Sequence, residues 1–237
     1  MKWHNLEFDT GDPSVYPPKP ASLLLAEVAV KRIQPGERVL DACTGSGIVG
    51  IAIAKYVRDV SVVLSDINEE ALSVARKNSE RNDVHVTTVV SALYDQFSDD
   101  EFDTITVHPP AVPYPDGEDW GLSAGMRIAT HGGEDGSRLV IPSIGEASRC
   151  LKQSGKLLIL LPHWSNVQKA WGELRRRYGR VVELAKQEVE FFPAKEGKPD
   201  TKLMQHVKTL AEAGVIEMNF DGLVPTSYVS VIEGIKA

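Results

Sequence analysis

The chain of 237 residues carries 26 Lys and Arg against 33 Asp and Glu, a formal net charge of −7. Its 42% hydrophobic and 25% charged residues are typical of globular domains and exclude a disordered or fibrous chain. The acidic balance argues against strong non-specific binding to nucleic acid, which needs clustered Lys and Arg. Two cysteines cannot build a structural zinc site, and we expect no metal. The longest apolar stretch, 157–161, is too short to cross a bilayer, and no secretory segment is apparent, so we expect a cytoplasmic protein without membrane contact.

Strand-like and helix-like segments alternate along most of the chain. Short apolar runs predict strands at 38–43, 60–64, 84–90, 102–107, 156–161, 180–191 and 228–232. Helical periodicity predicts helices at 20–34, 48–57, 68–81, 134–151, 167–178 and 201–213. This alternation indicates βαβ units and therefore a doubly wound α/β fold with a mostly parallel sheet. Ligands of such sheets bind beyond the carboxyl ends of the strands.

The whole chain, 1–237, is expected to form a single domain, in which residues 1–35 supply an irregular arm and the first helix. Two segments interrupt the regular alternation. Residues 108–125 hold four prolines and three glycines after a strand, which predicts a structureless substrate loop. Residues 192–225 form an insertion before the last strand, and its position makes it a candidate lid over the substrate.

A glycine-rich turn, Asp41-Ala-Cys-Thr-Gly-Ser-Gly47, joins the first central strand to the next helix. Glycines let the backbone turn sharply and let a ligand approach it, and the helix directs its N-terminal amides at that ligand. Asp66 follows nineteen residues after Gly47, at the end of the second strand. A carboxylate there can accept hydrogen bonds from both hydroxyls of a ribose, so the two features predict a nucleoside site.

Two cofactor classes compete for this turn. The spacing Gly45-x-Gly47-x-x-Gly50 matches the dinucleotide fingerprint and favours a nicotinamide-dependent oxidoreductase. Asp41 favours a different ligand, because a carboxylate just before the turn repels a pyrophosphate and attracts a cation. S-adenosylmethionine (SAM) carries an amine and a sulfonium and has no phosphate. The sequence also lacks an obvious second mononucleotide-binding half, which a dinucleotide needs.

The turn resembles the first motif of class I SAM-dependent methyltransferases. Asp66-Ile67-Asn68, followed by Ala71-Leu72-x-x-Ala75-x-x-Asn78, is similar to the second motif of the HemK-like branch, which methylates the glutamine side chain of release factors. Segments 15–25, 132–136 and 151–157 are also similar, so the resemblance covers roughly 15–162. It implies a Rossmann-like sheet of seven strands, the last antiparallel, with SAM as the cofactor.

By this resemblance, the cofactor site combines the ends of the first strands with the N-terminal helix. Asp41, Gly45 and Gly47 border the methionine part of SAM, Asp66 binds the ribose and Ile67 flanks the adenine. The implied cofactor-binding residues are Ser22, Asp41, Cys43, Gly45, Gly47, Asp66, Ile67, Ala92, Leu93 and His108.

The segment after the fourth strand implies the acceptor chemistry. In the family it reads Asn-Pro-Pro-Tyr and holds a planar nitrogen in line with the methyl group. Here it reads His108-Pro109-Pro110-Ala111, and His108, Pro109 and Pro110 are the candidate catalytic residues. An imidazole cannot reproduce the donor and acceptor of an amide, and an alanine cannot stack on a flat substrate. The expected substrate-binding residues are Ala111 in the motif itself, Tyr114 and Trp120, either of which could supply the missing ring, and His163 after the fifth strand.

Several functions remain open. The leading one is methyl transfer from SAM to a planar nitrogen of a protein glutamine or a nucleobase. His108, with a reference pKa near 6.5, could instead act as a general base toward a hydroxyl or an amine, which predicts a small-molecule N- or O-methyltransferase. A NAD-dependent oxidoreductase and a non-catalytic SAM-binding module are the further alternatives.

Overall fold

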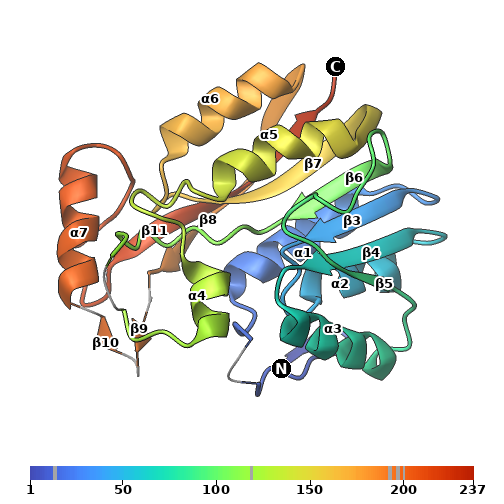
Figure 1. The fold of residues 1–237 in the computed structure, drawn as a ribbon, viewed down its shortest axis with the longest axis horizontal. Coiled ribbons are helices and arrows are strands. Elements are labelled where there is room, and N and C mark those ends of the chain that lie inside the picture. Colours follow the sequence, from blue (N-terminus) through green and yellow to red (C-terminus); the bar gives the residue numbers. More distant parts are fainter. Residues whose placement is uncertain (13–14, 118–119, 192–193, 196–197, 200) are drawn as a thin grey trace.

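A sheet of seven strands in the order β5-β4-β3-β6-β7-β11-β8 forms the centre of the molecule (Figure 1). The structure is a computed structural model that describes residues 1–12, 15–117, 120–191, 194–195, 198–199 and 201–237. The strands are β3 (Arg38–Ala42), β4 (Ser61–Asp66), β5 (Thr87–Val90), β6 (Phe102–Val107), β7 (Leu151–Pro162), β8 (Arg180–Glu190) and β11 (Thr226–Ile235). β3 to β7 pair in parallel, and β11 lies antiparallel between β7 and β8. The expected doubly wound fold with an antiparallel last strand is confirmed.

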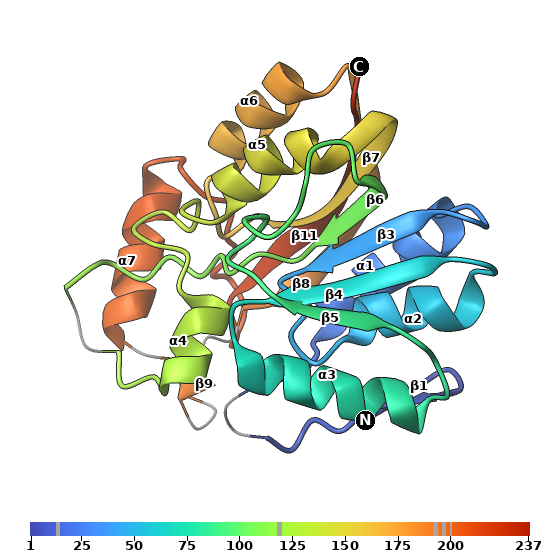
Figure 2. The ribbon, with the colours of Figure 1, turned by 45° about the vertical axis from the view of Figure 1, so that its right-hand side comes forward.

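Helices cover both faces of the sheet (Figure 2). One face packs against α1 (Pro20–Arg32), α2 (Ile48–Tyr56) and α3 (Glu69–Arg81), and the other against α5 (Val140–Cys150) and α6 (Val167–Arg177). Two further helices, α4 (Ala124–Thr130) and α7 (Thr201–Glu212), lie on the side of the sheet toward which the parallel strands run, with α7 beside β8 and β11 (Figure 1). No helix in the described ranges is both long and apolar enough to span a bilayer.

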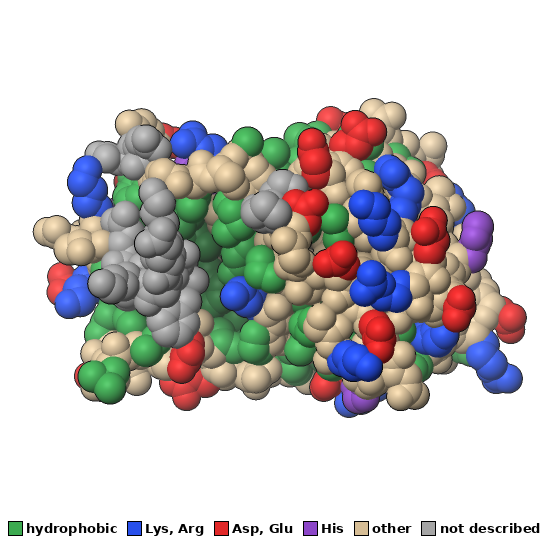
Figure 3. All heavy atoms as spheres, turned by 90° about the horizontal axis from the view of Figure 1, so that it is seen from below, with side chains coloured by type: hydrophobic (Ala, Val, Ile, Leu, Met, Phe, Trp, Pro, Cys, Tyr) green, Lys and Arg blue, Asp and Glu red, His purple; other side chains and the backbone are tan. Residues whose placement is uncertain are grey.

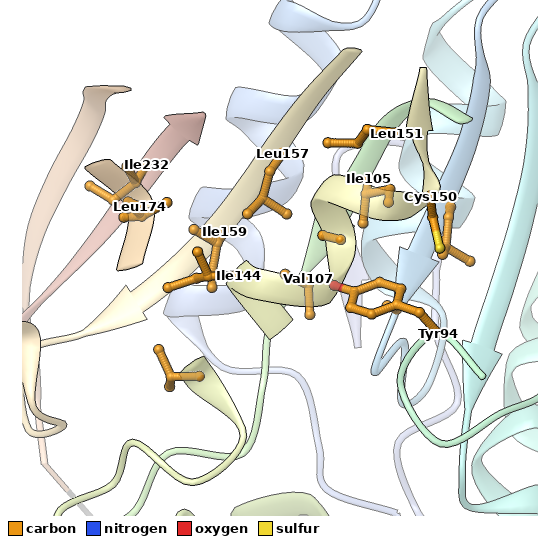
Figure 4. Close-up of a cluster of buried hydrophobic side chains, with 14 of the residues drawn as sticks. Tyr94, Ile105, Val107, Ile144, Cys150, Leu151, Leu157, Ile159, Leu174 and Ile232 are labelled. Atoms are coloured by element: carbon orange, nitrogen blue, oxygen red, sulfur yellow. The ribbon is translucent and has the colours of Figure 1, made fainter. Parts of the chain in front are cut away.

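A cluster of buried side chains fixes the sheet against α5 and α6 (Figure 4). Burial of each large aliphatic side chain contributes roughly 1.5–3 kcal/mol. Tyr94, fully buried in the segment after β5, adds a polar link, because its hydroxyl donates to the carbonyl oxygen of Ser143 on α5 at 3.0 Å. This packing holds the ends of β5 and β6 in fixed places, and the cleft described below is built on those ends.

The structure corrects several expected boundaries. The helix expected at 134–151 begins at Val140, because Gly133 and Gly136 adopt φ of 79° and 74° in a preceding turn. Pro142 then falls in the first helical turn, where its missing N–H has no partner to lose. The strand expected at 84–90 forms only at its end, as β5, and β7 begins directly after α5, five residues before its expected start.

Three segments expected to be irregular contain short elements. The N-terminal arm forms a hairpin of β1 (Lys2–Trp3) and β2 (Leu6–Glu7). The loop expected at 108–125 leads into α4, whose N-cap Ser123 accepts a hydrogen bond from the Met126 amide. In the insertion, β9 (Ala194–Lys195) pairs with β10 (Lys198–Pro199) before α7. Residues 192–193, 196–197 and 200 of this insertion lie outside the described residues.

Candidate active site

A cleft lies beyond the carboxyl ends of β3, β4, β6 and β7, where ligands of this architecture bind. Side chains of the arm, of α1 and of α4 complete its walls. Figure 3 shows a hollow with largely hydrophobic walls on the lower face of the molecule. The cleft is lined by twelve of the expected site residues: Ser22, Asp41, Cys43, Gly45, Asp66, Ile67, Ala92, Leu93, His108, Pro109, Pro110 and Ala111.

Left-handed backbone positions shape the turn after β3. Gly45 and Gly47 adopt φ of 55° and 87°, and Cys43 adopts 53°, which is unfavourable for a residue with a Cβ. A Cβ at Gly45 would meet no atom within 4 Å, so this glycine faces the open cleft. Gly47 does not line the cleft. A Cβ there would lie 2.8 Å from Ile51 Cδ1 and 3.1 Å from Ala75 Cβ, so Gly47 allows α2 and α3 to pack closely.

Asp41 is a buried carboxylate that organises this turn. Its Oδ2 accepts hydrogen bonds from Thr44 Oγ1 at 2.6 Å and from the Gly50 amide at 3.0 Å, and its Oδ1 accepts from Thr106 Oγ1 at 2.7 Å. Burial raises the pKa of Asp41 to about 6, although these three donors act in the opposite direction. A Cβ at Gly50 would overlap Leu64, so the third glycine of the fingerprint serves packing and the bond to Asp41.

Asp66 lies at the end of β4 with its carboxylate held by backbone amides. Oδ2 accepts from the Gly45 amide and Oδ1 from the Asn68 amide, both at 2.9 Å. Burial raises the pKa of Asp66 above its ordinary value. The next residue, Ile67, is 56% exposed although it is apolar, and it lines the cleft. A fixed carboxylate beside an exposed apolar side chain suits a ribose joined to a flat base.

The segment after β5 forms the adjoining wall. The Ser91 amide donates to the carbonyl oxygen of Asp66 at 3.0 Å, and Ser91 Oγ donates to that of Leu93 at 3.1 Å. Leu93 adopts φ of 46°, which turns the chain sharply at this point. Ala92 and Leu93 therefore border the same part of the cleft as Ile67.

His108, at the end of β6, faces α1 across the cleft. Its Nδ1 lies 3.3 Å from Ser22 Oγ, within hydrogen-bond distance. Burial lowers the pKa of His108 to about 4, so the imidazole is neutral at neutral pH. Burial also raises the pKa of the Cys43 thiol well above its ordinary value, which leaves this cysteine protonated and a poor nucleophile.

The N-terminal arm is joined to the glycine turn through α3. Asn78, fully buried, accepts from the Asp9 amide at 2.7 Å and donates through Nδ2 to the carbonyl oxygen of Ser46 at 3.0 Å. One side chain thus joins the arm to the glycine turn. The arm continues through 15–18, which line the cleft.

A family model described as methyltransferase small domain matches residues 17–191. The chain belongs to the methyltransferase small domain family.

Relatives of this methyltransferase domain confirm the expected likeness to the HemK-like branch. The release factor glutamine methyltransferase of Geobacter sulfurreducens is 32% identical over 157 residues, which cover 63% of this chain and 54% of the relative. The ribosomal protein uL3 glutamine methyltransferase of Francisella tularensis is 31% identical over 161 residues, which cover 65% and 51%. The chain thus spans about half the length of these relatives. A putative protein N5-glutamine methyltransferase of Methanocaldococcus jannaschii is 30% identical over 181 residues, which cover 76% of this chain and 88% of the relative.

Among solved structures, the Mtq2–Trm112 complex of E. cuniculi has a chain with a TM-score of 0.61 and 18% identity, which covers 94% of this chain and 99% of that chain. At such identity the likeness shows the fold alone.

Three expected substrate contacts of the methyltransferase domain lie away from the cleft lining. Tyr114 and Trp120 pack with tilted rings whose centroids lie 5.2 Å apart, and both are buried in a cluster with α7. His163 is buried, with Nδ1 2.6 Å from Glu217 Oε2 and Nε2 2.8 Å from Ser230 Oγ. Each ring therefore links parts of the fold.

The structure adds lining residues that the sequence interpretation missed. Trp164 follows the carboxyl end of β7 and lines the cleft. Its position one residue beyond His163 was the available signal, because both follow the same strand. Tyr16 of the arm and residues 128–130 of α4 also line the cleft. The described ranges hold no group of three His, Cys, Asp or Glu that could bind a metal.

The insertion lies next to the loop after β6. Leu203 and Val207 of α7 are fully buried against Tyr114 and Trp120, and His206 Nε2 lies 2.7 Å from the carbonyl oxygen of Glu134. The cleft lining contains no residue from the described part of the insertion. A lid function for 192–225 therefore stays a prediction.

Proposed function

We propose that this protein is a SAM-dependent methyltransferase that acts on a planar nitrogen, in the first place the side-chain amide of a protein glutamine. The observation that carries the proposal is the pairing of two features in one cleft. Asp66 and the glycine turn form one wall, and His108-Pro109-Pro110 forms another. Methyl transfer from SAM needs the cofactor and the acceptor side by side, and the two walls border one cleft.

The charge of the cleft supports SAM over a dinucleotide. Asp41 and Asp66 line it, and the described lining residues include no Lys or Arg. Two carboxylates suit a cation and repel a pyrophosphate. The family match supports the same choice.

The residues present fit SAM. Asp66 would accept hydrogen bonds from the ribose, and Ile67, Ala92 and Leu93 would enclose the adenine. Gly45 leaves space that a Cβ would narrow, next to Ser22 and Asp41 on the methionine side. When bound, SAM supplies an electrophilic methyl group on a positively charged sulfur.

His108 is proposed to position the acceptor. One imidazole nitrogen faces Ser22, and Nε2 has no hydrogen bond to the described residues. A neutral ring of low pKa can donate or accept one hydrogen bond but is a weak base at neutral pH. Pro109 and Pro110 stiffen the segment that carries it.

The relatives support a protein acceptor. Those from Geobacter sulfurreducens and Francisella tularensis are named for the glutamines of a release factor and of ribosomal protein uL3. An acceptor of the translation machinery would place this enzyme in the cytoplasm.

Methyl-labelled SAM tests the proposal. The protein is incubated with separate pools of protein, RNA and small metabolites, and the labelled pool is identified. We expect the label in protein, and peptide mapping after protease digestion should locate it on a glutamine side chain. Label in small molecules alone would favour the N- or O-methyltransferase alternative. Tight SAM binding without label in any pool would favour the non-catalytic module.

A further inference from the structure

Trp164 faces the same space as the segment that carries His108. β6 and β7 run in parallel with Val107 opposite Ile159, so the segments after them leave the sheet at the same edge. His108 follows β6, Trp164 follows β7, and both line the cleft. The indole therefore belongs to the end of the cleft where the acceptor must bind.

The indole is held in place before any substrate binds. Its ring centroid lies 5.3 Å from that of Phe191. Both ring nitrogens of the preceding His163 are hydrogen-bonded, and Ser165 Oγ on the other side donates to the carbonyl oxygen of Pro162 at 2.6 Å. A ring fixed in this way loses little conformational entropy when a ligand stacks on it.

The burial of the indole nitrogen shows which part of the ring lines the cleft. Nε1 is buried and has no hydrogen-bond partner among the described residues. The ring surface that lines the cleft is therefore carbon. An unpaired buried N–H is unfavourable, and a phenylalanine would avoid it. What tryptophan adds is a wide, flat aromatic surface.

The walls around this surface are apolar. Asp41 and Asp66 are the charged side chains of the described lining, and both belong to the cofactor half. A charged acceptor group would lose its hydration against the remaining walls, and the single hydrogen bond that His108 can offer would not replace that hydration. Between the acceptor segment and Trp164 in the chain, the lining residues are Ala111, Val112, Ile128, Ala129, Thr130, Leu139 and Pro162. The hydroxyl of Thr130 already donates to the carbonyl oxygen of Met126.

We infer that Trp164 is the stacking platform of the acceptor site and that the acceptor presents an uncharged planar amide to it. This inference rests on the proposed function and specifies which chemical group the methyl acceptor must offer. The family motif carries its ring directly after the two prolines, where this chain has Ala111. In this chain the segment after β7 supplies the ring.

Matched small probes test the inference on protein saturated with S-adenosylhomocysteine, the demethylated cofactor. Nicotinamide is paired with nicotinate, and N-acetyl-Gln-amide with N-acetyl-Glu-amide, so each pair differs in the charge of one planar group. We expect the neutral member to bind at least about tenfold more tightly, and the pair with the larger difference shows whether a ring amide or a side-chain amide is preferred. Equal binding within both pairs, or no binding of either neutral probe, would overturn the inference.

Variants assign the effect to the ring. Trp164→Leu should weaken neutral-probe binding at least about fivefold while S-adenosylhomocysteine affinity stays within about twofold. Trp164→Phe keeps a smaller ring and removes the unpaired N–H, so it should bind the neutral probes more tightly than Trp164→Leu does and unfold at an equal or higher temperature than the wild type. Trp171→Leu, on α6 outside the cleft, controls for loss of an indole.

The outcomes separate two kinds of failure. If Trp164→Leu binds the probes like the wild type, or loses probes and S-adenosylhomocysteine together, Trp164 is not the platform. If the wild-type protein fails to bind S-adenosylhomocysteine, the proposed function itself is wrong.

Discussion

Ser22 on α1 and His108 at the end of β6 meet across the cleft, with 3.3 Å between Ser22 Oγ and His108 Nδ1. The contact joins two segments that are 86 residues apart in the chain. It ties the helix that borders the cofactor side to the segment that borders the acceptor side. Because burial lowers the pKa of His108 to about 4, this contact is between neutral groups at neutral pH.

The first prediction concerns the role of His108. His108→Asn should retain or exceed wild-type turnover at pH 7.5, because an amide can also position a planar acceptor. A general base near its working pH typically contributes about 10²–10⁴-fold, so a base role predicts a loss of that size. His85→Asn, at an exposed position before β5, is the control. A step in the pH profile of kcat near neutrality that disappears in His108→Asn would contradict the positioning role.

The second prediction concerns pH and Asp41. Its pKa of about 6 means that its charge is lost as the pH falls through that value. If only the ionised form binds cationic SAM, the Kd rises about tenfold between pH 7 and pH 5. The raised pKa of Asp66 acts in the same direction. Calorimetry at both pH values measures this, and Asp41→Asn should show a flatter dependence. An affinity independent of pH would count against Asp41.

Stability of the cofactor-free protein should depend on pH in the opposite sense. The folded pKa of Asp41 lies above its ordinary value of 3.8, so the folded state binds the proton more tightly than the unfolded state. The contribution of Asp41 to stability is therefore full below about pH 4 and is lost as the pH rises through about 6. Chemical denaturation of the wild type and of Asp41→Asn across this window should show the wild type losing stability relative to the variant.

The third prediction separates Asn78 in α3 from Asn82, the C-cap residue of that helix. Asn78→Ala leaves the Asp9 amide and the Ser46 carbonyl without partners and should lower the free energy of unfolding by about 2–4 kcal/mol. It should also weaken SAM binding, because Ser46 belongs to the glycine turn. The side chain of Asn82 accepts a hydrogen bond from the Glu7 amide and donates one to the Glu7 carbonyl oxygen, both at 2.8 Å. It has no hydrogen bond to the glycine turn among the described residues.

Asn82→Ala is therefore the matched control. It should lower stability by a similar amount and leave SAM affinity unchanged. Denaturant titrations and calorimetry on both variants provide the comparison. Identical SAM affinities for the two variants would show that Asn78 acts on the fold alone.

The sheet and the residues that line the cleft at the strand ends could be predicted from the sequence because both depend on local patterns. Buried strands show as short apolar runs, and residues directly after them must lie at one edge of a parallel sheet. Asp66 and His108 were found in this way. Gly47 shows the limit of a motif, because its missing Cβ serves the contact with Ala75 and not the cleft.

The acceptor wall could not be predicted because it depends on packing between distant segments. Tyr114 and Trp120 follow the acceptor segment in sequence, yet α7 draws both rings into a separate cluster. The structure also forms α4, which begins at the end of the segment expected to be a structureless loop, and this helix contributes Ile128 to the cleft. Trp164, which follows β7, lines the cleft, whereas the two rings expected there from sequence proximity do not.

Calorimetric titration of SAM into the wild type and Asp66→Ala tests the central claim most directly. The wild type should bind one SAM per chain, and Asp66→Ala should bind at least about tenfold more weakly, since each charge-assisted hydrogen bond contributes roughly 1.5–3 kcal/mol. NADH should give no heat under the same conditions. Equal SAM affinity in both proteins, or binding of NADH in place of SAM, would contradict the account.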